Sequence, residues 1–387
     1  MAGWSEKVLD IDLNTQTYKT YPLDMEMARL FIGGRGLGAR LLWDLVGPEV
    51  DPLSPENVLI FTNGPLTGTG YQTSNRFSVT TKSPLTGTVL DANSGGFWGM
   101  QFKKAGYDVM IVRGKSARPV WIEIKSDQIM FHDASELWGM RVFALTQKLG
   151  QNNNHRNVLC IGPAGENLSR IASIMNDRER ALARGGPGAV MGSKNLKAIV
   201  VEGKERPEIH DRERFKFILY ETRKLLAGSP LTSQALPEFG TVVLMNIMNN
   251  IGALATRNHQ QTQFESAESI SGEELTEKYL VKNASCWACP IGCTRISKTE
   301  KVEGEGPEFE TTWAFGAQCG IADLPAIIEV NQLCNDLGLD TISAGSTIAC
   351  AMELSEKGYM DSDLRFGRAD QLAPVVEAMA YRRGVGA

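Results

Sequence analysis

The chain has 387 residues, of which 42% are hydrophobic and 22% are charged, and its formal net charge is −5. These values are typical of a globular protein with two or three domains, and they exclude collagen, coiled-coil and wholly disordered chains. The sequence lacks an apolar run of about 18 residues, an apolar N-terminal signal segment and any block of like charge, which argues against a membrane span, secretion and nucleic-acid binding. We therefore expect a cytoplasmic protein.

Alternating apolar residues predict a strand-rich region as far as residue 208. Residues 7–13 and 17–21 are expected to pair as a hairpin. Further strands are predicted over residues 58–62, 77–81, 109–113, 120–125, 158–161 and 198–202. Loops rich in glycine are expected between the strands, over residues 33–38, 64–70, 93–99 and 185–192.

Beyond residue 208 the apolar residues recur at three- and four-residue steps, which predicts helices. Asp211 suits the N-cap of the first helix and Gly228 its end, and Asp340 suits the N-cap of a later helix. The later helices are predicted over residues 325–336, 341–357 and 375–381. The predicted fold class is therefore α+β, with a β-rich N-terminal domain over residues 1–208 and an α-helical domain over residues 209–387.

Two glycine-rich segments imitate nucleotide-binding motifs. Residues 34–39 approximate the dinucleotide fingerprint, but the preceding residues look helical or mixed, whereas the fingerprint needs a strand there. The alternatives are a tight turn that only glycine can make and a backbone site for another anion. Residues 188–195 resemble a P-loop but place Lys194 and Asn195 wrongly for one, so a different phosphate cradle beside Arg184 is the alternative to a purely structural loop.

Three of the seven cysteines crowd into eight residues, as Cys286, Cys289 and Cys293. In a chain without a signal segment, this spacing favours metal or redox chemistry over disulfides. Short spacers and soft thiolates favour a [4Fe–4S] cluster. Structural zinc is the alternative, although no second pair of Cys or His is visible to complete it, and inert buried thiols are a third possibility. Cys319 is a candidate fourth ligand, but its neighbours resemble a packing segment of small residues.

The sequence as a whole resembles the N-terminal two-thirds of the aldehyde ferredoxin oxidoreductase family, the tungsten bis-pyranopterin enzymes. The resemblance covers the entire chain and depends on several motifs in the same order. These motifs are residues 7–13, 33–38, 74–76, 91–96, 183–186, 191–197, the cysteine triplet, 306–311 and 335–340. The implied fold is a β-rich base for two pterins, closed by two mainly helical domains, of which the third domain is expected to be absent from this chain.

The resemblance also implies cofactors and the residues that hold them. They are a tungsten (or molybdenum) bis-pyranopterin, a [4Fe–4S] cluster on the cysteine triplet, and Mg²⁺ that bridges the pterin phosphates. Asn93 and Ala183 match positions whose carbonyl groups help to hold the magnesium, and Gly95 matches a pterin contact. Arg76 matches a residue between pterin and cluster, with a surface ion pair as the alternative role.

A second group of residues matches the family in the helical region. Asn335, Leu339 and Asp340 match a pterin-binding turn, although the family form begins with Asp, and Asp340 has a competing role as a helix cap. Glu310 matches a carboxylate near the tungsten that is a candidate for proton transfer; the alternative is a solvated acidic run.

The implied reaction is the two-electron oxidation of an aldehyde to a carboxylate, with electrons leaving singly through the cluster to ferredoxin or a ferredoxin-like subunit. The resemblance also allows for a homodimer. Two alternatives stand beside it: the tungsten subunit of an aromatic acyl-CoA reductase-like complex, and a truncated, non-catalytic fragment. The family's fourth cluster cysteine and an active-site histidine are expected in the C-terminal third, beyond residue 387.

Overall fold

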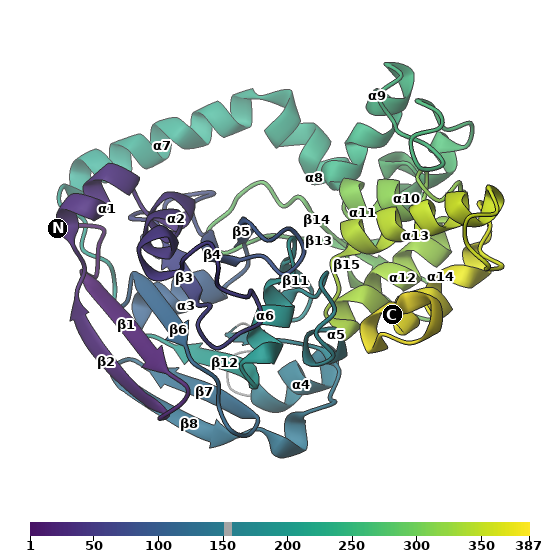
Figure 1. Cartoon of the computed structure of the whole chain (residues 1–387). Coiled ribbons are helices and arrows are strands. Elements are labelled where there is room, and N and C mark those ends of the chain that lie inside the picture. Colours follow the sequence, from purple (N-terminus) through teal and green to yellow (C-terminus); the bar gives the residue numbers. More distant parts are fainter. Residues whose placement is uncertain (151–156) are drawn as a thin grey trace. The chain divides into compact units, whose positions relative to one another are not determined.

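The computed structural model describes residues 1–150 and 157–387, which divide into two compact units (Figure 1). Unit 1 contains Met1–Glu221 together with two short segments, Cys286–Cys289 and Asp336–Leu339. Unit 2 contains the three remaining segments, Thr222–Ser285, Pro290–Asn335 and Asp340–Ala387. Within the described ranges, no helix combines the length with the apolar composition of a bilayer-spanning segment.

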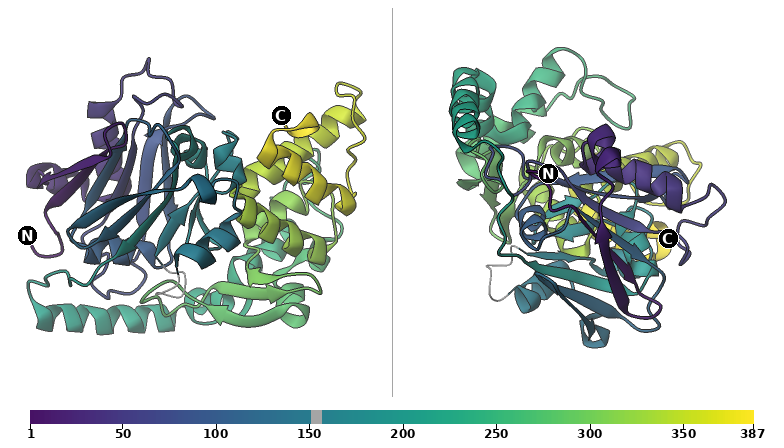
Figure 2. Two further views of the ribbon diagram at one scale, coloured as in Figure 1. Left: turned by 90° about the horizontal axis from the view of Figure 1, so that it is seen from below. Right: turned by 90° about the vertical axis from the view of Figure 1, so that its left-hand side faces the viewer.

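Two six-stranded sheets form the centre of unit 1, and Figure 2 shows them from two further sides. The first sheet consists of β1 (Lys7–Asp12), β2 (Thr17–Pro22), β3 (Leu59–Asn63), β4 (Phe77–Lys82), β5 (Val89–Ser94) and β6 (Val109–Arg113), in the order β2-β1-β6-β3-β4-β5. The second sheet consists of β7 (Val120–Lys125), β8 (Gln128–Asp133), β9 (Val158–Cys160), β10 (Ile174–Asn176), β11 (Arg180–Leu182) and β12 (Leu196–Glu202), in the order β11-β10-β9-β12-β7-β8.

Short helices accompany the two sheets. They are α1 (Met25–Phe31), α2 (Gly34–Leu45), α3 (Trp98–Lys104), α4 (Val142–Leu149), α5 (Pro163–Glu166) and α6 (Pro187–Ser193). The alternation of side chains along β6 shows how the layers pack, because successive residues point to opposite faces. Val109 and Ile111 join the apolar cluster under α2, whereas Met110 and Val112 join the cluster that contains residues of both sheets. The sheets therefore bury one face against each other.

Most of the predicted strands are present. The hairpin is confirmed, since β1 and β2 pair antiparallel from Lys7 opposite Pro22 to Asp12 opposite Thr17. The strands over 109–113 and 120–125 have the predicted bounds. β5, β8, β10 and β11 were not predicted from the sequence. β5 was missed because it carries polar residues and leads into the glycines that indicated a loop. Asn93 consequently lies on a strand rather than in the expected loop.

The prediction of a glycine loop over residues 33–38 is wrong, since Gly34 begins helix α2. A helix precedes this segment, so the strand that the dinucleotide fingerprint requires is absent from it. The glycines let α2 approach the first sheet closely: a Cβ on Gly38 would lie 3.0 Å from the Cβ of Thr80. The segment thus has a packing function that its resemblance to the fingerprint concealed.

The expected loop over residues 185–192 is also partly wrong, because α6 begins at Pro187. Its glycines lie against backbone: a Cβ on Gly188 would be 2.7 Å from the carbonyl carbon of Ser173, and one on Gly192 would be 2.7 Å from that of Gly165. Every residue of α6 is buried. This close packing accounts for the glycine density without a P-loop.

Helices dominate unit 2, as predicted. The chain contains α7 (Arg212–Gly228), which crosses the division between the units, and then α8 (Leu236–Phe239), α9 (Leu244–Asn250), α10 (Gly272–Lys278), α11 (Phe309–Phe315), α12 (Leu324–Leu337), α13 (Thr341–Glu356) and α14 (Leu372–Tyr381). Asp211 Oδ1 accepts a hydrogen bond from the amide of Arg214 at 2.9 Å, and Asp340 accepts from the amides of Ile342 and Ser343 at 3.2 Å. Both predicted N-caps are therefore confirmed.

The description of the second region as α-helical is incomplete. Unit 2 also contains a three-stranded antiparallel sheet, formed by β13 (Leu280–Ala284), β14 (Thr294–Lys298) and β15 (Glu303–Glu305). These strands flank the cysteine triplet in sequence and are only three to five residues long, so no alternating apolar pattern indicated them. The α+β class itself is confirmed, with a β-rich region followed by a mainly helical one.

Candidate functional site

Cys286, the first cysteine of the triplet, and the adjacent Trp287 lie against the glycines that follow β5. The amide of Trp287 donates a hydrogen bond to the carbonyl of Gly96 at 3.2 Å. A Cβ on Gly95 would lie only 2.6 Å from the Sγ of Cys286. The backbone at residue 95 can therefore approach this thiol so closely only because it carries no side chain.

Two buried asparagines hold this glycine segment in place. The Nδ2 of Asn176 donates to the Oγ of Ser94 at 2.9 Å and to the carbonyl of Gly95 at 2.8 Å. The Nδ2 of Asn75 donates to the carbonyl of Gly96 at 2.8 Å. The Oδ1 atoms of both asparagines are buried and have no hydrogen-bond partner among the described residues. Buried acceptors normally have a partner, so these two oxygens mark a place where a bound group could complete the site.

Arg76 and Asn93 form a polar pair next to the glycine segment. The Nε of Arg76 donates to the Oδ1 of Asn93, and its terminal nitrogen lies 3.4 Å from the carbonyl oxygen of Asn93. Pairing of β4 with β5 brings the two residues together, and the Nδ2 of Asn93 donates back to the carbonyl of Phe77 at 3.1 Å. Both side chains are exposed. The pair therefore has a fixed position and an open face.

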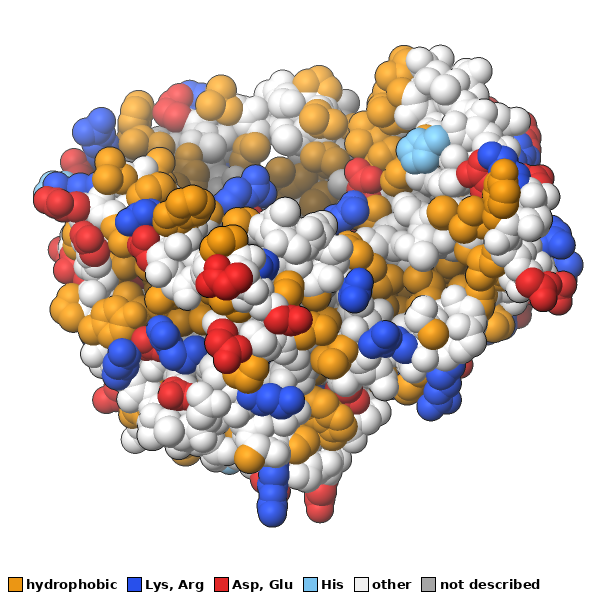
Figure 3. Space-filling model, viewed as in Figure 1, with side chains coloured by type: hydrophobic (Ala, Val, Ile, Leu, Met, Phe, Trp, Pro, Cys, Tyr) orange, Lys and Arg blue, Asp and Glu red, His pale blue; other side chains and the backbone are white. Residues whose placement is uncertain are grey.

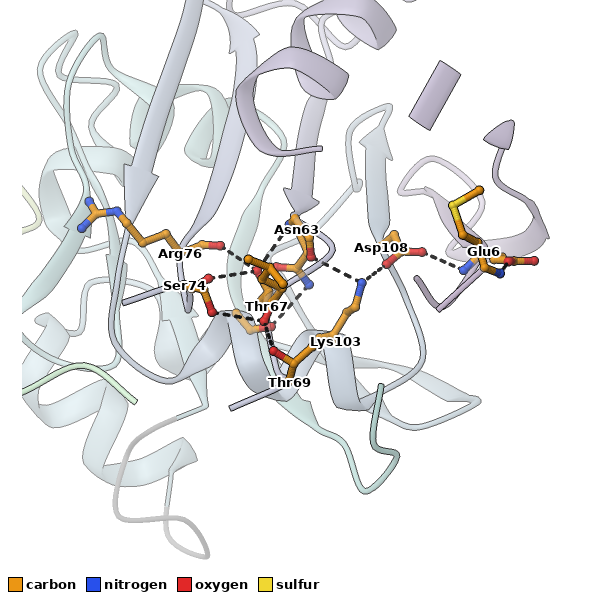
Figure 4. A network of polar contacts seen from close by, with 12 residues as sticks. Glu6, Asn63, Thr67, Thr69, Ser74, Arg76, Lys103 and Asp108 are labelled. Atoms are coloured by element: carbon orange, nitrogen blue, oxygen red, sulfur yellow. Dashed lines mark hydrogen bonds and ion pairs between the residues drawn. The ribbon is translucent and has the colours of Figure 1, made fainter. Parts of the chain in front are cut away.

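A buried polar network supports the loop that ends at Arg76 (Figure 4). The hydroxyl of Thr67 donates to the carbonyl of Arg76 at 3.1 Å. At the other end of the network, Lys103 forms a fully buried ion pair with Asp108, and its Nζ lies 3.5 Å from the carbonyl of Gly64. Burial lowers the pKa of the Lys103 ammonium, and the charge of Asp108 opposes that shift. The loop is thus anchored in the interior of unit 1.

Ala183 belongs to a segment that packs beside β5. It follows β11 directly and is half-buried. A Cβ on Gly185, two residues later, would lie 2.9 Å from the Cγ of Leu90 on β5. The hydroxyl of Ser83 also donates to the carbonyl of Gly185 at 2.7 Å. Ala183 and Asn93, the two residues predicted to bind magnesium through carbonyl groups, therefore lie on neighbouring elements.

The predicted pterin turn extends over both units. Leu339 is buried in unit 1, where it pairs with Ala172, while Asn335 is buried at the end of unit 2's second segment. Between them, Asp336 accepts a hydrogen bond from the amide of Phe143 at 2.8 Å. Burial raises the pKa of the Asp336 carboxyl. Asp340, the last residue of the predicted turn, caps α13 as described above.

The remaining predicted ligands occupy different environments. Cys286, Cys289 and Cys293 are half-buried and form no disulfide, and the first two belong to unit 1 and the third to unit 2. Across residues 1–150 and 157–387, no three His, Cys, Asp or Glu side chains are grouped as a metal site. The three-cysteine ligand set therefore stays a prediction. Glu310 is exposed in the first turn of α11, so its role in proton transfer also stays a prediction.

Cys319 lies in the packed interior of unit 2. Its thiol is fully buried, and its Sγ lies 3.4 Å from the carbonyl of Ala314 and 3.5 Å from that of Gly345. Burial raises the pKa of this thiol well above its ordinary value. These contacts favour the packing role over the role of fourth cluster ligand, because a ligand must be available as a thiolate.

Sequence reasoning did not identify Asn75, Asn176, Lys103 or Asp108. Asn75 lies within one of the motifs that carry the family resemblance, so a signal for it was present. Asn176 gave no local signal, because its partner Gly95 lies 81 residues away in sequence. Lys103 and Asp108 are only 5 residues apart, but no sequence pattern indicated that both side chains are buried. Their importance emerges only from the fold.

The donor set fits the group that the cysteine spacing implies. Three cysteines outside any disulfide are present, and the bare backbone at Gly95 leaves the Sγ of Cys286 room that a Cβ would occupy. The unpartnered Oδ1 atoms of Asn75 and Asn176 can accept hydrogen bonds from a ligand that carries amines. Two of the thiols, those of Cys286 and Cys289, and the two polar acceptors therefore belong to unit 1.

Comparison with known families gives two matches that together cover most of the chain. Residues 8–203 match the N-terminal domain of aldehyde ferredoxin oxidoreductase, and residues 218–387 match domains 2 and 3 of aldehyde ferredoxin oxidoreductase.

Individual proteins show the same similarity. The chain is 47% identical to the tungsten-containing aldehyde ferredoxin oxidoreductase of Thermococcus kodakarensis and 46% identical to that of Pyrococcus furiosus; each match covers 100% of this chain and 66% of the relative. Among solved structures, the active-site complex BamBC of benzoyl-coenzyme A reductase with 1,5-dienoyl-CoA is similar, with a TM-score of 0.88 and 30% identity. That match covers 100% of this chain and 61% of the other.

Proposed function

The chain belongs to the aldehyde ferredoxin oxidoreductase family, and on that premise we propose that it is part of a tungsten-pterin enzyme that oxidises an aldehyde to a carboxylate. The chain spans 66% of the length of the curated relatives it matches, so activity, substrate and partners are all part of the proposal. The observation that carries it is the close approach of Gly95 to Cys286 beside the Arg76–Asn93 pair.

We assign the pterin cofactor to two groups of residues. Arg76, Asn93, Gly95 and Ala183 would hold it and its bridging Mg²⁺ from the β-rich region. Asn335, Leu339 and Asp340 would hold it from the turn before α13. When bound, the tungsten bis-pyranopterin supplies the two-electron chemistry that no side chain can supply.

The side chains of this chain would orient and neutralise the cofactor. The guanidinium of Arg76 is positioned by Asn93 and keeps donors for an anionic group, since its fork has five N–H bonds. Cys286, Cys289 and Cys293 would bind a [4Fe–4S] cluster, which passes electrons singly. Glu310 is exposed and could exchange a proton with water, as a general acid–base group requires. The ferredoxin route, a cytoplasmic location and a homodimer belong to the same proposal.

The first experiment is elemental analysis of protein purified without oxygen. We expect tungsten near one and iron near four atoms per chain, since one bis-pterin and one [4Fe–4S] cluster contain those numbers. Cys289→Ser should remove most of the iron. The matched control is Cys350→Ser, because Cys350 is exposed on α13 and lies outside the triplet. Unchanged iron in Cys289→Ser would contradict the cluster assignment.

A second function has one specific observation in its favour. The chain is similar in fold and 30% identical to part of the benzoyl-coenzyme A reductase complex. A subunit of an aromatic acyl-CoA reductase-like complex would act on a CoA thioester and not on a free aldehyde. Parallel assays with an aldehyde and an aromatic acyl-CoA, with a viologen dye as the electron carrier, separate the two. Metal-free protein that is folded would instead indicate a non-catalytic fragment.

A further inference from the structure

A pocket of about 390 Å³ lies in unit 1 next to the cysteine loop. Trp287, which stands between Cys286 and Cys289 in the sequence, forms part of its wall. The rest of the wall comes from residues 68–70 in the loop before β4, from Lys104 at the end of α3, from the segment after β12 and from the first turns of α7. The pocket therefore adjoins two of the predicted cluster ligands without containing them.

The charged residues of this pocket are all cationic. They are Lys104, Arg206, Arg212 and Lys216, and no acidic residue lines it. Lys216 pairs with Glu213 at 2.7 Å, whereas Lys104, Arg206 and Arg212 form no ion pair with any described residue. Elsewhere the two signs are mixed: Figure 3 shows Lys and Arg side chains interspersed with Asp and Glu over one face. On a chain of net charge −5, this pocket is a local concentration of positive charge.

The fold of unit 1 fixes the walls of the pocket. The Nζ of Lys104 lies 5.6 Å from the ring centroid of Trp287. The amide of Glu205 donates to the carbonyl of Lys104 at 2.9 Å, which ties the segment after β12 to the end of α3. The rings of Tyr71 and Phe215 are 6.0 Å apart and hold the start of α7 against the loop before β4. The cations are therefore carried by segments whose positions are fixed by these contacts.

We propose that this pocket is the docking site for an acidic iron–sulfur electron carrier of the ferredoxin class. The inference rests on the proposed function, because it supplies the exit for electrons from a cluster on the neighbouring cysteines. Trp287 and Phe215 line the pocket together with its four cations, and aromatic residues and arginines are enriched in protein interfaces. Carboxylates of the carrier would face Lys104, Arg206 and Arg212 and guide the encounter.

The transfer itself changes no covalent bond. One electron passes from the reduced cluster to the oxidised carrier, so the cluster loses one electron and the carrier gains one. A protein partner fits the pocket better than a free small anion. Arg206, Arg212 and Lys216 are exposed, and exposed cations steer large charged partners while holding single ions weakly in water.

The test measures binding of an acidic 2[4Fe–4S] ferredoxin to the whole chain, without oxygen, at low and at high ionic strength. We expect wild-type binding to weaken as salt is added, and the double variant Arg206→Glu/Arg212→Glu to bind at least about tenfold more weakly at low salt. The matched control is Lys115→Glu/Arg118→Glu, which makes the same charge change at exposed positions beyond the far end of β6. Its affinity should stay within about twofold of wild type.

Three outcomes would overturn the docking site. They are absence of wild-type binding at low salt, equal affinity of the Arg206/Arg212 variant, and loss of affinity in both double variants alike. Saturation of the pocket by inorganic phosphate without ferredoxin binding would show a small-anion site instead.

A second readout separates the docking site from the proposed function. Aldehyde-dependent reduction of benzyl viologen, a small dye that needs no docking surface, should be equal in wild type and variant, while ferredoxin reduction falls. Failure of the viologen assay with salt-sensitive ferredoxin binding intact would contradict only the proposed function.

Discussion

Residues 185–192 and residues 95–96 are both glycine-rich segments of unit 1, but different atoms crowd their glycines. A Cβ on Gly188 or Gly192 would meet the backbone of another segment, at Ser173 or at Gly165 of α5, with the closest carbonyl carbon 2.7 Å away in each case. A Cβ on Gly95 would instead meet the Sγ of Cys286 at 2.6 Å. The first segment is crowded by the fold itself, and the second by a predicted metal ligand.

The difference indicates how glycine density in this sequence should be interpreted. Backbone cannot move away without disturbing the sheet or helix to which it belongs, so glycine in residues 185–192 is needed for stability. A cysteine side chain on a loop can rotate, so glycine at residue 95 is needed less for stability than for the position of the thiol. Alanine substitutions should therefore separate stability from iron binding.

The largest loss of stability is expected for Gly192→Ala. The new Cβ would press on the backbone of Gly165 inside fully buried α6, and overpacking of this kind lowers the free energy of unfolding by about 3 kcal/mol. Urea unfolding followed by circular dichroism would measure the change, with an unaltered slope against urea concentration.

The control for this substitution is Gly228→Ala at the end of α7, where a Cβ would meet nothing within 4 Å. We expect that variant to be unchanged or more stable by up to about 1 kcal/mol, because alanine restricts the unfolded chain. Equal effects of the two substitutions would contradict the role of backbone crowding.

A smaller loss of stability is expected for Asn176→Ala, which removes a buried side chain that holds the glycine segment in place. The substitution removes the donor to Ser94 and Gly95 and leaves their buried oxygens without it, at a cost of about 2 kcal/mol. The glycine segment at residues 95–96 should also hold Cys286 less firmly, so the iron content should fall together with the unfolding midpoint.

Asn167→Ala is the matched control, since Asn167 is exposed and its Nδ2 makes one hydrogen bond, to the carbonyl of Pro163 at 2.7 Å. Its cost should be within about 0.5 kcal/mol. If Asn176→Ala were as mild as this control and kept its iron, the glycine segment would not depend on the buried amide.

The helices and several strands were predictable because their signals are local. Asp211 and Asp340 cap helices by bonding to amides two or three residues away, and the strand over 109–113 alternates within itself. The family resemblance also placed Arg76, Asn93 and Gly95 in one site, and the structure brings these three together. Local chemistry and motif order were enough for this much.

Other features could not be predicted, because they depend on partners distant in sequence. The glycines at the start of α2 looked like a loop until the position of Thr80 was known. The amide of Asn176 gained a function only when the fold brought β10 to the end of β5. The strands around the triplet are short and pair with each other, and the apolar residues of β13 do not alternate with polar ones, so hydrophobic periodicity carried no signal for β13.

The smallest loss of stability, and the sharpest test of the comparison, is expected for Gly95→Ala. Because the Sγ of Cys286 can rotate away, the free energy of unfolding should fall by less than about 1 kcal/mol. Rotation would move the thiol out of the position that Gly95 leaves open, so iron retained after anaerobic reconstitution should fall to a minor fraction of the wild-type amount. Gly64→Ala is the matched control, since its Cβ would be 3.9 Å from the Oγ1 of Thr67, an ordinary contact. A Gly95→Ala protein that retained its iron would show that the position of the thiol does not depend on the bare backbone at residue 95. A Gly95→Ala protein that lost as much stability as Gly192→Ala would show that both glycine segments are needed for stability alone.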